Sequence, residues 1–171
     1  MPTEASSEVV VAPALPGEWA VVRELRLAAL EDAPEAFCST LEGERGLEEG
    51  AWRRKLDDPD RTTLVARYRR EAAGMAVLGV WDEDGVEATA DIGGVWVAPV
   101  GRGRGVGDAL ISSALGLARD RGLRRVLLEV GDHNVWAQEL YARHGFTPTG
   151  RTSAMPPPKQ HVTEHELARD L

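Results

Sequence analysis

The sequence has 171 residues, 43% of them apolar, and a formal net charge of −8. We expect a single domain over residues 1–171, with 1–7 as a loose end, because this length and apolar content suit one hydrophobic core. The acidic charge disfavours a general nucleic-acid binder, and no apolar run reaches the length of a membrane span.

The cysteine content and the first residues bear on where the protein works. Cys38 is the one cysteine, which excludes an internal disulfide and a multi-cysteine metal site, and we expect it to be a small buried residue. The four histidines lack metal-ligand spacing, so no metal is predicted. The first residues lack the basic and apolar regions of a secretory signal. A cytoplasmic protein with no membrane or nucleic-acid partner is the expectation.

The first half of the chain predicts strands and amphipathic helices. Apolar and β-branched runs predict strands at 9–11, 61–67 and 73–81, and helical spacing predicts helices at 18–33 and 47–56. Pro34 ends the first helix, and residues 82–85 form a strong turn signal.

A central strand follows, at residues 86–98. Apolar side chains alternate up to Ile92, but after Gly93-Gly94 the apolar phase flips to Val95 and Val97. Because side chains alternate with period two, the flip indicates one extra residue, a β-bulge. The alternative is that Gly93-Gly94 weakens the strand or begins a turn.

A loop of alternating glycines leads from this strand into a predicted helix at 108–121. Glycines at 101, 103, 105 and 107 alternate with Arg102, Arg104 and Val106. Glycines before a helix N-terminus expose free N–H groups at the positive end of the helix dipole, which is an anion site for phosphate or pyrophosphate. The GxxxxGK[ST] loop and the GxGxxG fingerprint both fail here.

The rest of the chain predicts three more strands, at 124–130, 145–152 and 161–171, and a helix at 134–143 with Asn134 as a candidate N-cap. The predicted order is β-α-α-β-β-β-α-β-α-β-β. This order fits an α/β (α+β) domain with a mixed sheet and flanking helices.

Two motifs resemble those of the GCN5-related N-acetyltransferases. Arg102-x-x-Gly105-x-Gly107 is similar to the family's pyrophosphate motif, [Q/R]-x-x-G-x-[G/A]. The pattern from Asn134 through Tyr141 to Gly145-Phe146 is similar to N-x-x-A-x-x-[L/F]-Y-x-x-x-G-F. The resemblance implies the acyl-CoA N-acyltransferase fold, with a mixed central sheet whose bulged fourth strand splays from the next. It also implies that the first helices and the last hairpin, including 155–161, shape the acceptor pocket.

The same resemblance implies that acetyl-CoA is the cosubstrate and marks the residues that hold it. Its thioester and pantetheine would lie along Val95, Trp96 and Val97, where the N–H of Val97 would face the thioester carbonyl. The implied cofactor-binding set is completed by Arg102, Gly103, Arg104, Gly105, Val106, Gly107, Asn134 and Tyr141.

Catalytic roles follow from the resemblance and from the chemistry of acyl transfer. Tyr141 would stabilise or protonate the departing thiolate, although a core tyrosine is the alternative. A base that neutralises the amine lies eleven positions before the phosphate motif in some family members, which is Asp91 here. Glu87 lies on the same strand face and is the other candidate. A solvated strand face explains both carboxylates equally well.

We therefore expect an acetyl-CoA-dependent N-acetyltransferase in which a primary amine attacks the thioester directly. The alternative is a non-catalytic domain that binds or senses acyl-CoA, and the failed fingerprints disfavour a nucleotide-binding regulator. The acceptor, small molecule or peptide, is not specified by the motifs. A homodimer is common in the family and stays open here.

Overall fold

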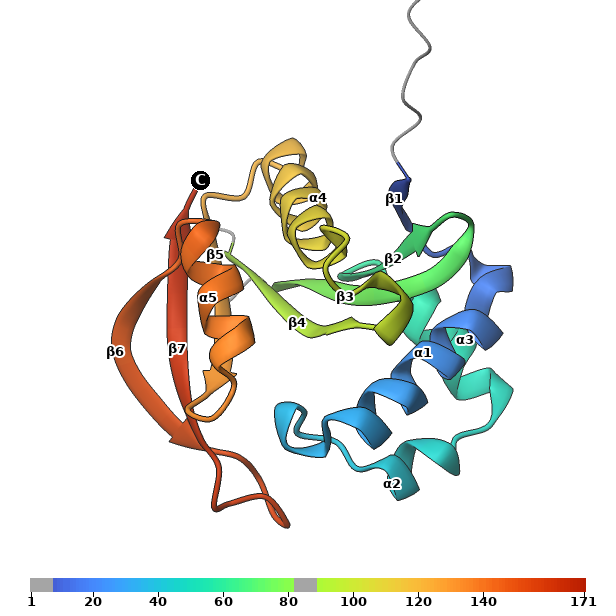
Figure 1. Cartoon of the computed structure of the whole chain (residues 1–171), viewed down its shortest axis with the longest axis horizontal. Coiled ribbons are helices and arrows are strands. Elements are labelled where there is room, and N and C mark those ends of the chain that lie inside the picture. The colour runs from blue at the N-terminus through green and yellow to red at the C-terminus, as the bar shows by residue number, and fades with distance from the viewer. Residues whose placement is uncertain (1–7, 82–88) are drawn as a thin grey trace, which may run out of the picture.

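A seven-stranded mixed sheet organises the computed structural model, which describes residues 8–81 and 89–171. The strand order is β1-β2-β3-β4-β5-β7-β6, and every neighbouring pair is antiparallel except β4 and β5 (Figure 1). The strands are β1 (Val9–Pro13), β2 (Arg61–Tyr68), β3 (Glu71–Trp81), β4 (Thr89–Val97), β5 (Arg125–Gly131), β6 (Thr147–Ala154) and β7 (Thr163–Asp170).

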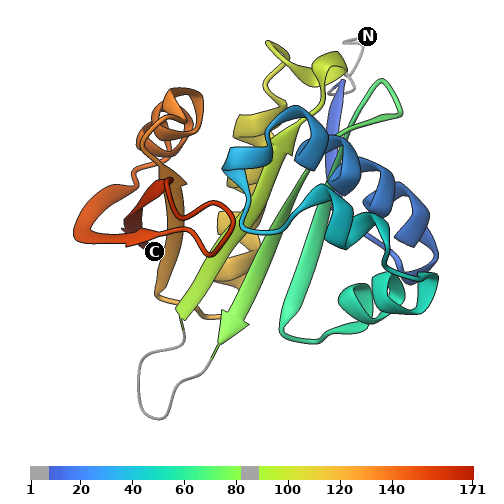
Figure 2. The same cartoon turned by 90° about the horizontal axis from the view of Figure 1, so that it is seen from below.

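Helices cover both faces of this sheet (Figures 1 and 2). α4 (Val106–Asp120) is the crossover between the parallel strands β4 and β5, and it packs on one face with α5 (Val135–Arg143) beside it. The other face carries α1 (Trp19–Asp32), α3 (Glu49–Asp57) and the short α2 (Leu41–Arg45). The mixed α/β class predicted from the sequence is confirmed.

The strand pattern explains why there are two apolar clusters, one on each face. On β2, Leu64 and Ala66 belong to the cluster under α4, whereas Val65 between them belongs to the cluster under α1. All three are at most 2% exposed. Successive strand residues point to opposite faces, so a continuous apolar run is what a sheet covered on both sides requires.

The bulge in β4 lies where the sequence predicted it. Met75 pairs with Trp96 and Val77 with Gly93, so β4 has one more residue than β3 between these pairs. Gly94 has a φ of +59°, a left-handed conformation that glycine adopts without steric cost. The bulge explains the flip in apolar phase after Gly93.

The predicted splay is also present. β4 and β5 pair only at Thr89–Asp91 with Arg125–Leu127, and beyond that point the two strands separate (Figure 1). The edge of β4 from Ile92 to Val97 is therefore without a strand partner on that side, within the described part of the chain.

Some boundaries differ from the sequence-based expectations. α4 begins at Val106, two residues earlier than predicted, because Gly105 is its N-cap with a φ of 78°. The short α2 was not predicted, and the predicted turn at 82–85 lies outside the described residues, as does Glu87. None of the described helices is long and apolar enough to cross a membrane.

Candidate active site

A cleft of about 580 Å³ opens where β4 and β5 separate. Its walls come from four places: the end of α1 with the residues after it, the free edge of β4, the glycine loop with the start of α4, and one side of α5 with its N-cap. The predicted site residues that line it are Val95, Trp96, Val97, Arg102, Gly103, Gly105, Val106, Gly107 and Asn134. Segments far apart in the sequence thus share one cavity.

The glycine loop forms an open cradle at the N-terminus of α4. Gly103 and Gly105 have φ values of +69° and +78°, and a Cβ built on either would meet nothing within 4 Å. α4 is 15 residues long, so its first N–H groups carry the positive end of a full helix dipole. The loop can therefore accept an anion directly on its backbone.

Arg102 is held to the wall of the cleft by two acceptors. Its Nε donates to the carbonyl of Val97 at 3.1 Å, and its guanidinium donates to Oδ2 of Asp32 at 2.5 Å. The indole Nε1 of Trp96 donates to the same Asp32 oxygen at 3.0 Å. These contacts lower the pKa of Asp32, Trp96 contributing most.

Asp32 is a residue that sequence reasoning missed. It lies at the end of α1, 70 positions before Arg102, and it lines the cleft. No local pattern marks such a partner, because the pair forms only when α1 packs against β4.

Arg104, in contrast, does not line the cleft. Its guanidinium lies over the ring of Tyr68, 5.4 Å from the ring centroid, on the side of the loop that faces β2. The structure therefore separates the two arginines of the loop, with Arg102 at the cleft and Arg104 at a cation–π contact.

The backbone of Val97 faces the gap between the splayed strands. Ala98 donates its N–H to the carbonyl of Ala73 at 2.8 Å, and the next pair along the ladder is Val97 with Gly74. Bonded and non-bonded pairs alternate in an antiparallel ladder, so the N–H and C=O of Val97 point away from β3. An extended ligand in the gap could pair with this edge as an added strand would.

Asn134 and Tyr141 occupy different positions on α5. Asn134 is the N-cap, as predicted: its side-chain oxygen accepts the N–H of Ala137 at 3.2 Å, and it lines the cleft. Tyr141 is 6% exposed and packs edge-on against Phe146, with ring centroids 6.1 Å apart. Burial raises the pKa of its phenol. Tyr141 is not among the residues that line the cleft, which its neighbour Leu140 does line.

Asp91 lies on the other side of β4, in two adjoining cavities of about 590 and 650 Å³. We call the larger one, between β4, β5, β7 and the residues after α1, the carboxylate cavity. It shares Ala36 and Phe37 with the cleft, so the two spaces adjoin at that segment. Desolvation raises the pKa of Asp91 and outweighs the opposing effect of Arg61. A carboxylate with a raised pKa, beside the splay, is suited to take a proton.

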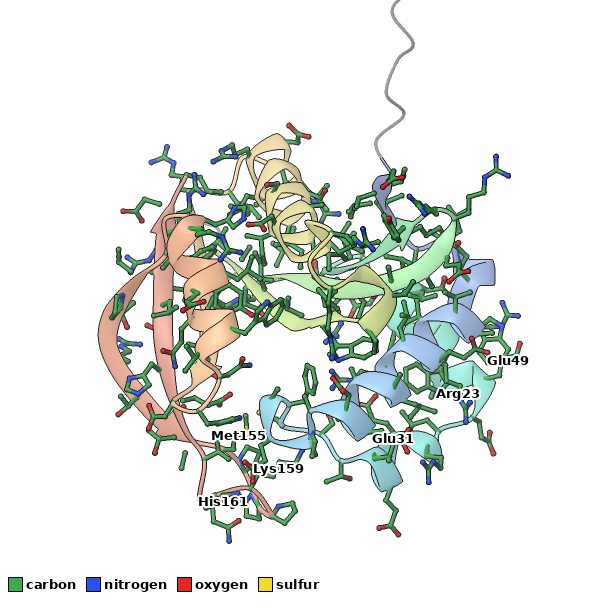
Figure 3. All side chains as sticks on the ribbon, viewed as in Figure 1. Arg23, Glu31, Glu49, Met155, Lys159 and His161 are labelled. Carbon is green, nitrogen blue, oxygen red and sulfur yellow. The ribbon has the colours of Figure 1, made fainter. Side chains whose placement is uncertain are left out.

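Lys159 ties the β6–β7 loop to the segment between these cavities. Its Nζ donates to the carbonyls of Pro34, Phe37 and Ser39 at 2.5, 2.6 and 2.6 Å, and its side chain is buried. Nε2 of His161 lies 2.6 Å from Oε1 of Glu35. Figure 3 labels Lys159 and His161 in this loop. The predicted loop 155–161 does not itself line the three cavities. Through Lys159 it binds the segment 34–39, which does line them.

Two further residues were not foreseen in their actual places. Cys38 is exposed and lines the carboxylate cavity, so the expectation that it is buried was wrong. Arg26 lines the same cavity, but its guanidinium is paired with the buried carboxylate of Glu44 at 3.0–3.1 Å and lies over the ring of Phe37. The positive charge of Arg26 is therefore balanced by Glu44.

Comparison with known proteins agrees with this architecture. The chain is 36% identical over 124 residues to mycothiol acetyltransferase of Beutenbergia cavernae, covering 72% of this chain and 39% of that protein. It is 31% identical over 139 residues to an uncharacterized N-acetyltransferase of Mycobacterium bovis, covering 81% and 85%. The fold matches that of yncA from Salmonella typhimurium, solved with its cofactor acetyl-CoA, with a TM-score of 0.78 and 21% identity over 96% of this chain and 94% of that one.

The chain therefore spans about two fifths of the mycothiol acetyltransferase and most of the mycobacterial relative. Residues 23–146 match the model of the acetyltransferase (GNAT) family, from within α1 to the end of the second predicted motif. With the splayed sheet and the glycine loop in place, this match shows that the protein belongs to the acetyltransferase (GNAT) family.

Proposed function

We propose that this protein transfers the acetyl group of acetyl-CoA to a primary amine, which attacks the thioester directly. The observation that carries the proposal is the cleft itself. It joins an anion cradle at α4 to the free edge of β4, and it adjoins, at Ala36 and Phe37, a cavity that holds Asp91.

The residues of the cleft fit a coenzyme A molecule. The open glycine backbone from Arg102 to Gly107 suits the pyrophosphate, since a side chain at Gly103 or Gly105 would require a strained φ. The edge of β4 at Val97 has no partner strand on the cleft side and turns its N–H toward the pantetheine amides, while its carbonyl already accepts from Arg102. The Asn134 amide lies in the opposite wall. When bound, acetyl-CoA supplies an activated acetyl group as a thioester.

Asp91 would receive the proton that a protonated amine must lose before it attacks, through a water molecule because the aspartate side chain is short. Desolvation raises its pKa above the ordinary value of an aspartate, which brings it closer to neutral pH. The amine nitrogen then forms a bond to the acetyl carbon as the carbon–sulfur bond breaks. The nitrogen gives up its second proton as the amide forms, the departing sulfur takes one up, and the products are an amide and free coenzyme A.

Tyr141 is proposed as the donor that protonates the departing thiolate, and the second proton of the amine, released as the amide forms, then restores the phenol. The support is chemical: a phenol is protonated at neutral pH and can donate to a developing thiolate. Burial raises the pKa of this phenol, which keeps the proton in place and makes it a weaker acid. Tyr141 follows Leu140, which lines the cleft, and Tyr141→Phe tests the role directly.

Thermal unfolding with and without acetyl-CoA tests the proposal. At about 100 times Kd, the ligand should stabilise the fold by about 2.7 kcal/mol, which raises Tm by roughly 5–10 °C for a chain of this size. The double variant Arg102→Glu/Gly105→Glu should lose the rise, whereas Arg151→Glu, an exposed charge reversal on β6, should keep it. The rate at which the free thiol of coenzyme A is released, with each of a set of primary amines, then measures turnover. A wild type with no rise at saturating acetyl-CoA would refute the proposal.

A further inference from the structure

The carboxylate cavity is lined by four acidic side chains, Asp91, Glu129, Glu164 and Glu166. Arg26 is the cation on its lining, among the described residues, and Glu44 neutralises it. Arg61 acts on Asp91 from outside this lining, so the cavity of about 650 Å³ carries an excess of negative charge around Glu129, Glu164 and Glu166. A ligand in it would gain most by being a cation.

Strand register places these acids on one face of the sheet. Asp91 pairs with Leu127, Glu129 is two residues further along β5, and Glu129 pairs with Glu166 of β7. Glu164 pairs with Gly131, again two residues along. From a strand spacing of about 4.8 Å and a rise of about 3.3 Å per residue, the Cα of Asp91 lies roughly 8 Å from that of Glu129 and roughly 16 Å from that of Glu164.

Glu164 is the most unusual member of the set. It is 6% exposed, yet it lines the cavity. Its side-chain hydrogen bond is to a second carboxyl group, that of Glu129, which also acts on it through its charge. Burial, and then the charge of Glu129, raise the pKa of Glu164. A buried acid beside a second acid destabilises the free protein, and a bound cation would offset that cost.

We propose that Glu164 and Glu129 bind a second positively charged group of the acceptor, so that the preferred acceptor is an amine with at least two cationic groups. The reacting amine lies toward Asp91, and the other ammonium lies between Glu129 and Glu164. This inference rests on the proposed amine acetylation and deepens it by naming the acceptor class. Glu164 and Glu129 act as specificity residues and take no part in the bond-forming step.

The test compares unbranched diamines, from 1,2-diaminoethane to 1,8-diaminooctane, with monoamines of the same chain length. Each ligand pair differs by one ammonium group, so the ratio of their kcat/KM values isolates the second charge. Thiol release at saturating acetyl-CoA gives the rates, and titration calorimetry with the protein–CoA complex gives binding without turnover. The wild type should prefer the longer diamines, because the carboxylates lie several ångströms from Asp91.

Glu164→Gln and Glu129→Gln should each reduce the diamine preference about ten- to a hundredfold, the value of a charge-assisted contact. The change should fall on KM, with kcat for monoamines retained. Asp170→Asn, which removes the same charge at the exposed end of β7 outside the cavity, is the control and should keep the preference.

Equal use of monoamines and diamines by the wild type would overturn the inference, as would an unchanged preference in Glu164→Gln or calorimetry that shows no binding of any diamine. Stabilisation by acetyl-CoA is measured on the same samples. A protein stabilised by acetyl-CoA that shows no diamine preference would keep the proposed function and lose this acceptor class.

Discussion

The carboxylate of Asp91 lies directly over Gly79, its partner across the β3–β4 ladder: a Cβ built on Gly79 would stand 2.6 Å from Oδ1 of Asp91. No real Cβ approaches an oxygen so closely, so Gly79→Ala must displace the carboxylate. Since we propose Asp91 as the base, Gly79→Ala should lower kcat by about tenfold or more, although Asp91 is still present.

Gly116→Ala provides the control for Gly79→Ala, because the added methyl on α4 meets nothing within 4 Å. It should leave kcat unchanged, and helix propensity predicts a slight rise in Tm. The measurement is kcat at saturating substrates, with Tm to show that both variants fold. If Asp91→Asn is inactive but Gly79→Ala is fully active, the position of the carboxylate over Gly79 does not matter for the reaction.

The ion pair between Asp32 and Arg102 should make a pH-dependent contribution to stability. The folded-state pKa of Asp32 lies below its usual 3.8, so the folded state binds fewer protons than the unfolded state in that range. The stabilisation is present above pH 4 and is lost as the pH falls through the lowered pKa. Because both side chains are about half exposed, its size at pH 7 should be about 1 kcal/mol or less.

Urea unfolding of Asp32→Asn between pH 7 and pH 3 measures this contribution. The variant should be less stable than the wild type at pH 7, and the difference should shrink toward pH 3. Glu31→Gln, the exposed neighbour on α1, is the control and should show no such pattern. A difference that grows as the pH falls would contradict the assigned pair.

Lys159 should matter to both stability and substrate binding. Lys159→Met removes three charged donors from the carbonyls of Pro34, Phe37 and Ser39 and leaves those groups without their partner. We expect a loss of about 2–4 kcal/mol in the free energy of unfolding. The segment 34–39 should become more mobile, so KM should rise for acetyl-CoA and for the acceptor. Gln160→Met, an exposed position in the same loop, should change neither quantity.

Glu164→Gln should stabilise the protein in the absence of ligand. The pKa of Glu164 is raised above its usual 4.5. Between pH 4.5 and this raised pKa the folded state holds a proton that the unfolded state has released. The free energy of unfolding therefore falls as the pH rises through that range. The variant should therefore have the higher Tm at pH 8, with the gap closing below pH 4.5. A lower Tm at pH 8 would show that the carboxylate is satisfied within the fold.

Tyr141→Phe tests the proposed proton donor. Loss of a general acid should lower kcat about a hundredfold or more, with a small change in Tm because the ring and its contact with Phe146 remain. Tyr68→Phe removes the other phenol of the chain, which donates to Glu8 at 3.1 Å, and should retain activity. Unchanged kcat in Tyr141→Phe would assign Tyr141 to the core alone.

The sequence by itself determined most of the fold and the position of the cleft. Period-two patterning located the strands of the sheet, and the change of phase at Gly93-Gly94 located the bulge, because these features depend on neighbours a few residues apart. The glycine loop and the N-cap at Asn134 are local as well, and both lie where the motifs predicted them.

Only the tertiary structure decided which side chains meet across the chain. Asp32 with Arg102, Lys159 with the carbonyls of Pro34, Phe37 and Ser39, and Glu164 with Glu129 join residues between 35 and 125 positions apart, and nothing in their local sequence requires these contacts. Local sequence also did not show that Arg104 contacts the ring of Tyr68, or that Tyr141 is buried and does not line the cleft. Backbone geometry follows from short-range pattern, whereas the direction and charge environment of a long side chain depend on elements that packing brings together.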